Sequence, residues 1–153
     1  MSTSQTPADC SSEQIAQLVQ AVEDCTLAPA EFTHQAHMTV AIWYLARMPL
    51  AEATAAMRAT IQRFAAHHGK HQLYHETITV FWMQLLHHYA DSAAPQLPLA
   101  DLAQRAIADL SGMQPLLRHY SRECLFSEQA RRAWVAPDRL ALPFIIDQST
   151  TDT

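Results

Sequence analysis

Apolar residues recur every three or four positions along most of this chain, which is the spacing of one buried face on an α-helix. The stretch around Ile78, Trp82 and Leu86 is apolar over more than half of the helical circumference, which predicts a central helix packed against several neighbours. We expect main helices over about 12–25, Thr33–Met48, 50–68, 73–90 and 98–111.

Helix start and stop signals fall between these segments. Ser11 with Gln14 resembles a capping box, Thr33 is a predicted N-cap, and Gly69 is a predicted left-handed C-terminal cap. The 8 prolines lie between the periodic segments. With only 2 glycines and no sustained two-residue alternation, an all-β fold is excluded.

The C-terminal third is less regular. Pro115–Phe126 is expected to be helical but irregular, and Ser127 should cap a last short helix to Trp134. Pro137, Pro143 and the run LPFII suggest an extended tail packed on the bundle. We therefore predict an all-α, single-domain bundle of four to five main helices with an irregular C-terminal cap. Its boundaries are expected to be a disordered leader over 1–10, the bundle over 11–146 and a frayed tail over 147–153.

The amino-acid composition argues against some classes of binding partner. The chain has 153 residues and 49% hydrophobic residues, enough for a core without a structural metal. Its net charge is −5, and a single lysine with scattered arginines argues against nucleic acid as a partner. No apolar run is long enough for a membrane span, and the first residues lack the features of a signal peptide.

These absences predict a cytoplasmic protein that does not enter a membrane. The three cysteines form no CxxC pair and are odd in number, which fits a reducing compartment. The sequence leaves the oligomeric state open, and a homodimer is one of the alternatives.

Nine histidines are the unusual feature, and His34 with His37 forms the first group of interest. Two histidines three residues apart lie on the same side of a helix, so both rings can reach one ion. If Thr33 is the N-cap, His34 lies in the first turn, where the helix dipole disfavours a charged imidazole. A neutral ring is also what a metal requires.

The second group, Tyr74-His75-Glu76-Thr77-Ile78-Thr79, opens the most apolar helix. Polar side chains inside a buried helix need hydrogen-bond partners or a ligand. His75 and Glu76 are separated by about 100° around a helix, so both could face one cavity. The alternative is that Glu76 and Thr77 cap the helix start while His75 packs.

Together the two groups suggest a metal centre with His34, His37 and His75 as ligands. Three nitrogen ligands plus an open position are typical of a catalytic site. Glu76 would be a fourth ligand or the general base. The ion would be one divalent transition metal, either Zn, Fe, Ni, Mn or Cu. A di-iron site is not favoured, because Glu31-x-x-His34 has no second Glu-x-x-His motif.

The predicted function is therefore a metal-dependent enzyme, either a hydrolase or lyase or an oxygenase, acting on a small organic molecule. Tyr44, Tyr74 and Thr79 would line its pocket, and a tyrosine hydroxyl could serve as a general acid. Two alternatives stay open. One is a non-catalytic helical module that binds a ligand or partner and uses the histidines structurally, and the other is a metal-free enzyme in which His75 and Glu76 perform acid–base chemistry.

Other polar residues are open in role. His71 precedes His75 by about one helical turn and could be a further ligand. His119 and Arg122 lie in the irregular segment, where an arginine could contact an anionic substrate or form a surface pair with Glu123. No phosphate-binding loop, GxSxG elbow or HExxH motif is present in the sequence, which leaves nucleotide hydrolysis and the commoner serine and zinc hydrolases unsupported.

Phe32-Thr33-His34-x-x-His37 followed by Tyr74-His75-Glu76-Thr77 resembles a family of small all-helical bacterial proteins of uncharacterised function. The resemblance covers about residues 30–90, with a weaker echo around Tyr120-Ser121-Arg122-Glu123. The resemblance implies that the two motifs act together, but it does not indicate which reaction the protein catalyses. The arrangement is also similar to DinB-like metal proteins, at the level of architecture alone.

Overall fold

The chain folds as a helical bundle, seen in a computed structural model that describes residues 7–93 and 97–142. Within these residues there is no β-strand, and five of the helices have seven or more residues. The predicted all-α class and the single-domain bundle are confirmed.

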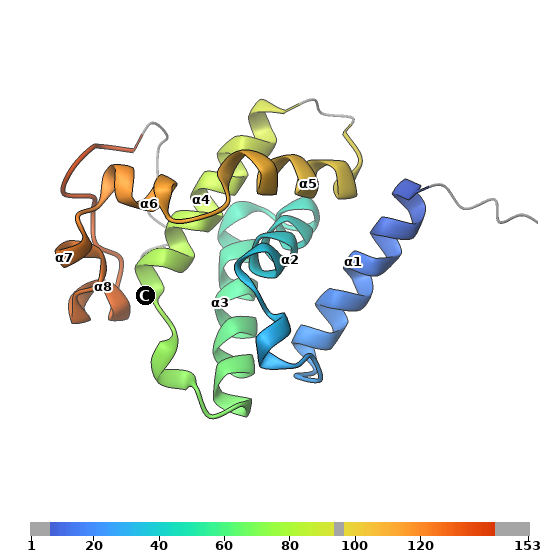
Figure 1. The fold of residues 1–153 in the computed structure, drawn as a ribbon, viewed down its shortest axis with the longest axis horizontal. Coiled ribbons are helices and arrows are strands. Elements are labelled where there is room, and N and C mark those ends of the chain that lie inside the picture. Colours follow the sequence, from blue (N-terminus) through green and yellow to red (C-terminus); the bar gives the residue numbers. More distant parts are fainter. Residues whose placement is uncertain (1–6, 94–96, 143–153) are drawn as a thin grey trace, which may run out of the picture.

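Five long helices build the bundle, and two of them lie at its centre. They are α1 (Pro7–Glu23), α2 (His34–Arg47), α3 (Leu50–His67), α4 (Glu76–Ser92) and α5 (Leu99–Leu110). Helix α2 contacts α1, α3, α4 and α5, while α4 contacts α2, α3, α5 and α8. Figure 1 shows α2, α3 and α4 side by side, with α1 on one flank and α5 across them.

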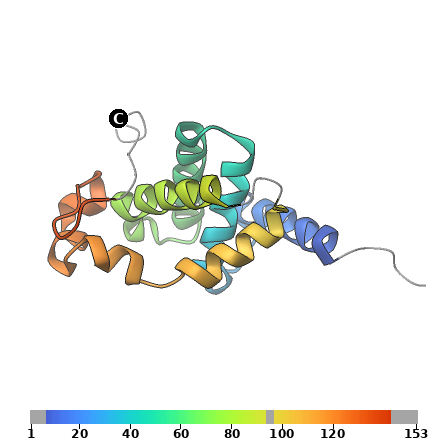
Figure 2. The ribbon, with the colours of Figure 1, turned by 90° about the horizontal axis from the view of Figure 1, so that it is seen from above.

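Three short helices form the irregular end: α6 (Gln114–His119), α7 (Arg122–Leu125) and α8 (Glu128–Arg132). Figures 1 and 2 both show them at the end of the molecule opposite α1. Two single-turn 3₁₀ helices, η1 (Pro29–Glu31) and η2 (His71–Leu73), precede α2 and α4. The expected irregular C-terminal cap is present.

The helix ends agree with the sequence where a cap is local. Thr33 Oγ1 accepts a hydrogen bond from the Ala36 N–H at 3.2 Å, so Thr33 is the N-cap of α2. Ser127 caps α8 in the same way, although that helix ends at Arg132 instead of Trp134. Gly69 ends α3 with a φ of +73°, the left-handed conformation that glycine adopts without strain.

Two helix starts differ from expectation. Helix α1 begins at Pro7, so Ser11 does not start it, and residues 7–10 are helical although disorder was expected there. Proline is well accommodated at a first helical position, since its missing N–H has no partner there in any case. Helix α4 begins at Glu76 instead of about residue 73. Residues 1–6, 94–96 and 143–153, which include the expected frayed tail, lie outside the described residues.

The core lies among α1 to α5 and contains side chains from each of them, including Val22, Val40, Met57, Phe81 and Ala106. No helix among the described residues is long and apolar enough to cross a membrane. Cys25 and Cys124 are free thiols.

Candidate functional site

A cavity of about 300 Å³ lies between α2, α3 and α4 and is almost entirely apolar. We call it the apolar cavity. Its walls are Met38 and Ala41 of α2, Met57 and Ile61 of α3, and Ile78, Thr79, Trp82, Met83 and Leu86 of α4. The polar side chains on it are those of His34, His37 and Thr79. Small-molecule sites commonly have this character, with apolar walls and a few placed polar groups.

His37 is held in one orientation by local contacts at the start of α2. Its Nδ1–H donates to the Thr33 carbonyl at 2.8 Å, and its ring stacks on Phe32 with centroids 3.7 Å apart and an interplanar angle of 9°. Because a carbonyl can only accept, Nδ1 carries the proton and Nε2 keeps its lone pair. Burial lowers the pKa of His37, so the ring is neutral near neutral pH.

His34 lies one turn earlier on the same side of α2 and also lines the apolar cavity. Its ring meets the Trp82 ring edge to face, with centroids 4.8 Å apart. Partial removal of the ring from water lowers the pKa of His34 as well. Burial therefore favours the neutral form of both rings.

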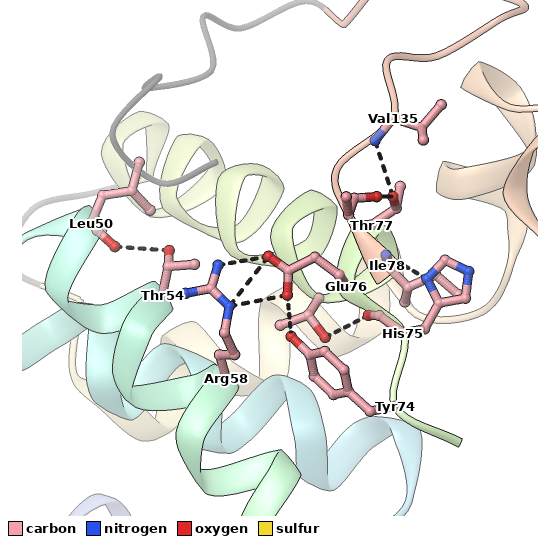
Figure 3. A network of polar contacts seen from close by, with 11 residues as sticks. Leu50, Thr54, Arg58, Tyr74, His75, Glu76, Thr77, Ile78 and Val135 are labelled. Carbon is pink, nitrogen blue, oxygen red and sulfur yellow. Dashed lines mark hydrogen bonds and ion pairs between the residues drawn. The ribbon is translucent and has the colours of Figure 1, made fainter. Parts of the chain in front are cut away.

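His75 does not join this pair. It is the N-cap of α4, and its Nδ1 accepts a hydrogen bond from the Ile78 N–H at 3.1 Å. Its Nε2–H donates to the Leu125 carbonyl at 2.6 Å, so both ring nitrogens are occupied. Figure 3 shows the ring on the opposite side of the α4 N-terminus from the Glu76 carboxylate. The expected three-histidine ligand set is therefore not assembled.

Glu76 is also engaged within the protein. Its carboxylate accepts from Arg58 Nε at 3.0 and 3.2 Å and from Arg58 Nη2 at 2.7 Å. The Tyr74 hydroxyl donates to Glu76 Oε1 at 2.5 Å (Figure 3). Burial and the neighbouring carboxylate raise the pKa of Tyr74. This buried network joins α3 to the start of α4, and both carboxylate oxygens have partners in it.

Tyr44, like Tyr74, does not line the apolar cavity, contrary to expectation. Its hydroxyl donates to Glu23 Oε2 at 2.6 Å and lies 2.8 Å from Thr60 Oγ1, which ties α2 to α1 and α3. Burial, together with the hydrogen bond to Glu23, raises the pKa of Tyr44 to about 12. Thr79 does line the cavity, with its hydroxyl donating to the His75 carbonyl at 2.9 Å.

No group of three or more His, Cys, Asp or Glu side chains within residues 7–93 and 97–142 is arranged to hold a metal ion. The pair formed by His34 and His37 is what remains of the predicted centre. The reason is the start of α4: as an N-cap residue outside the helix, His75 turns back toward the free N–H groups of its own helix.

The sequence left the roles of His119, Arg122 and His71 open, and the structure places them in three different surroundings. His119 is buried, and its Nδ1 lies 2.9 Å from the Leu140 carbonyl, so it holds the last described segment in place. Arg122 is exposed. His71 is in η2 and lines a polar groove of about 760 Å³ together with Arg58, Arg131 and Arg132.

Each arginine of that groove lies beside a glutamate, and two of the three arginines share one glutamate. Arg58 binds Glu76, while Arg131 and Arg132 both lie within 4 Å of Glu128. The groove therefore gives no specific indication of a ligand.

Sequence analysis indicated no role for Arg58, and it indicated a solvated surface position for His68 beside Gly69. Arg58 follows buried Thr54 by one helical turn, which places a long cationic side chain near a buried face and is the one local signal available. His68 follows Phe64 by one turn in the same way, and its ring packs on that of Phe64 at 4.5 Å. Neither spacing identifies the partner.

No protein-family model matches the chain, and neither a curated protein nor a solved structure is significantly similar to it.

Proposed function

We propose that this protein binds a small, mainly apolar organic molecule in the apolar cavity, and that His37 Nε2 accepts a hydrogen bond or a proton from it. The observation that carries the proposal is a neutral histidine of fixed tautomer on a cavity whose other walls are nearly all apolar.

The size and lining of the cavity support a small ligand. Its volume of about 300 Å³ lies at the lower end of the range for small-molecule sites. Eleven residues line the cavity. Two of them are His34 and His37, and the other nine also come from α2, α3 and α4. Binding would be driven by removal of apolar surface from water, and the histidines would supply orientation.

The surroundings of His37 support an acid–base role. A proton accepted at Nε2 would leave an imidazolium whose Nδ1–H already donates to the Thr33 carbonyl. That hydrogen bond becomes stronger when the donor is charged, so it stabilises the protonated ring. This reaction type corresponds to the metal-free alternative raised by the sequence, with His37 in place of His75 and Glu76.

A second candidate is a single divalent metal ion, from the series Zn, Fe, Ni, Mn and Cu, held by His34 and His37. Histidine ligands commonly donate their other ring N–H to a carbonyl, as His37 does to Thr33. Water or the substrate would have to supply the other ligands. Catalytic zinc usually has three protein ligands, which makes this candidate the weaker one.

Calorimetric titration of the untagged protein with 1-octanol tests the main proposal. We expect saturable binding that Ala41→Leu abolishes without lowering the melting temperature, because the larger side chain fills the cavity. Ala59→Leu is the matched control, since Ala59 is exposed on α3 and does not line the cavity. Absence of saturable binding to wild type, or equal binding by Ala41→Leu, would refute the proposal.

Elemental analysis of the same untagged preparations tests the second candidate. A stoichiometric transition metal that is lost in His34→Ala and in His37→Ala would favour the metal centre. Metal-free protein that still binds 1-octanol would favour the main proposal.

A further inference from the structure

A second hollow adjoins the apolar cavity and, unlike it, has a charged side chain on its wall. It has a volume of about 340 Å³ and shares the side chains of His37 and Ile61 with the apolar cavity. Its other polar residues are His68, Lys70 and Tyr74. We call this hollow the lysine pocket. A molecule that extended past His37 and Ile61 would reach from the apolar cavity to the side chain of Lys70.

His68 has an unsatisfied polar atom at this pocket. Its Nε2 is enclosed by protein and has no hydrogen-bond partner among the described residues. The ring packs against Phe64, with centroids 4.5 Å apart, and against His67, with centroids 4.9 Å apart. Buried polar atoms are nearly always paired in folded proteins, so an orphaned nitrogen on a residue that lines a pocket indicates a missing partner.

Lys70 gives the pocket its charge. It is the one lysine of the chain, and the left-handed turn at Gly69 brings it to the end of α3. Within the described residues Lys70 makes no ion pair with a carboxylate. No aspartate or glutamate lines either hollow, so Lys70 is the single formal charge on their described walls. The combined site is therefore electropositive at one end.

We propose that the apolar cavity and the lysine pocket form one site for an amphipathic anion such as a medium-chain carboxylic acid. The apolar chain lies in the apolar cavity, and the carboxylate accepts a hydrogen bond from Lys70 Nζ and, once the His68 ring turns toward it, from His68 Nε2–H. This inference rests on the proposed binding of an apolar molecule and adds the charge and the polar end of that ligand.

The site accounts for three separate features. The carboxylate supplies the acceptor that His68 Nε2 lacks, and it neutralises Lys70. The ligand chain covers apolar walls that would otherwise face water. His37 lies where the two hollows meet, close to the polar end of the ligand.

Calorimetric titrations with sodium octanoate, 1-octanol and octylammonium test the charge preference at one chain length. We expect octanoate to bind about fivefold tighter than 1-octanol, since Lys70 is exposed and a solvated ion pair contributes only modestly. Lys70→Gln should remove this preference and leave the affinity for 1-octanol unchanged. Arg105→Gln is the control, because it removes a positive charge that borders neither hollow.

His68→Phe provides a second variant that keeps the packing on Phe64. We expect it to weaken octanoate binding about fivefold and to raise the melting temperature of the free protein, because the orphaned nitrogen is gone. The single lysine also allows a direct measurement by NMR. Reductive ¹³C-methylation labels Lys70 and keeps its charge. The NMR signal of the labelled Lys70 should shift when octanoate is added.

The outcomes separate this inference from the proposed function. If neither octanol nor octanoate binds, the proposed function itself is wrong. If octanol binds but octanoate binds no tighter, if Lys70→Gln keeps the preference, or if the Lys70 signal does not move, the anion site is wrong while the apolar cavity stands. Tighter binding of octylammonium also overturns it.

Discussion

Replacement of Glu76 by glutamine should destabilise the protein strongly, because the Glu76 carboxylate is the centre of a buried polar network. Glu76 is 6% exposed and accepts three close contacts from Arg58 and one from Tyr74. Glutamine keeps the volume and can still accept from Tyr74, but its amide group turns a donor toward the donors of Arg58. Arg58 then loses its ion pair with the Glu76 carboxylate.

The expected magnitude follows from this environment. Removing one member of a buried ion pair costs about 3–5 kcal/mol, because the remaining charge is uncompensated. The Arg58 side chain is 24% exposed, so water can solvate part of its charge. We therefore expect the lower end, about 3 kcal/mol, for Glu76→Gln.

Urea unfolding followed by tryptophan fluorescence measures this loss, and a double-mutant cycle identifies its origin. Arg58→Met should also destabilise, whereas the double variant should be more stable than the sum of the single effects by about 2 kcal/mol. Glu128→Gln is the control, because Glu128 is 70% exposed and its ion pair with Arg132 should contribute less than about 1 kcal/mol.

Additive effects of Glu76→Gln and Arg58→Met, or a Glu76→Gln loss no larger than that of Glu128→Gln, would show that the network does not hold α4 to α3. A Glu76→Gln variant of normal stability that lost ligand or metal binding would instead return Glu76 to the functional role that the sequence suggested.

Two further predictions concern the start of α4. Burial lowers the pKa of His75 below its usual 6.5, so the unfolded chain binds a proton first as the pH falls, and the free energy of unfolding should decrease from about pH 6.5 downward. His75→Asn keeps an N-cap acceptor but does not titrate. In urea unfolding between neutral and acidic pH, the free energy of unfolding of this variant should therefore decrease less steeply than that of the wild type. An equally steep decrease would contradict this role of His75. Thr77→Val keeps the side-chain shape but removes the hydroxyl that donates to the Ala133 carbonyl and accepts from the Val135 N–H. We expect a loss of about 1–3 kcal/mol and faster amide exchange at Val135, and neither change would be seen if the C-terminal segment were held mainly by apolar contacts.

Local rules were sufficient for most of the fold. The apolar spacing predicted the five long helices, and the caps at Thr33, Gly69 and Ser127 were correct. These features depend on residues within one or two turns of each other, so the sequence carries them directly. The same locality explains why His34 and His37 do lie on one cavity, as their spacing predicts.

The position of His75 could not be read from the sequence, because it depends on contacts across the fold. Its Nε2 binds the carbonyl of Leu125, 50 residues away, and Glu76 binds Arg58, 18 residues away. Because α4 starts at Glu76 and not at about residue 73, His75 is a cap and not a helical residue, and its ring binds the Ile78 N–H and the Leu125 carbonyl. Spacing along the chain fixes which side of a helix a residue occupies, whereas the packing of other helices decides what that side faces.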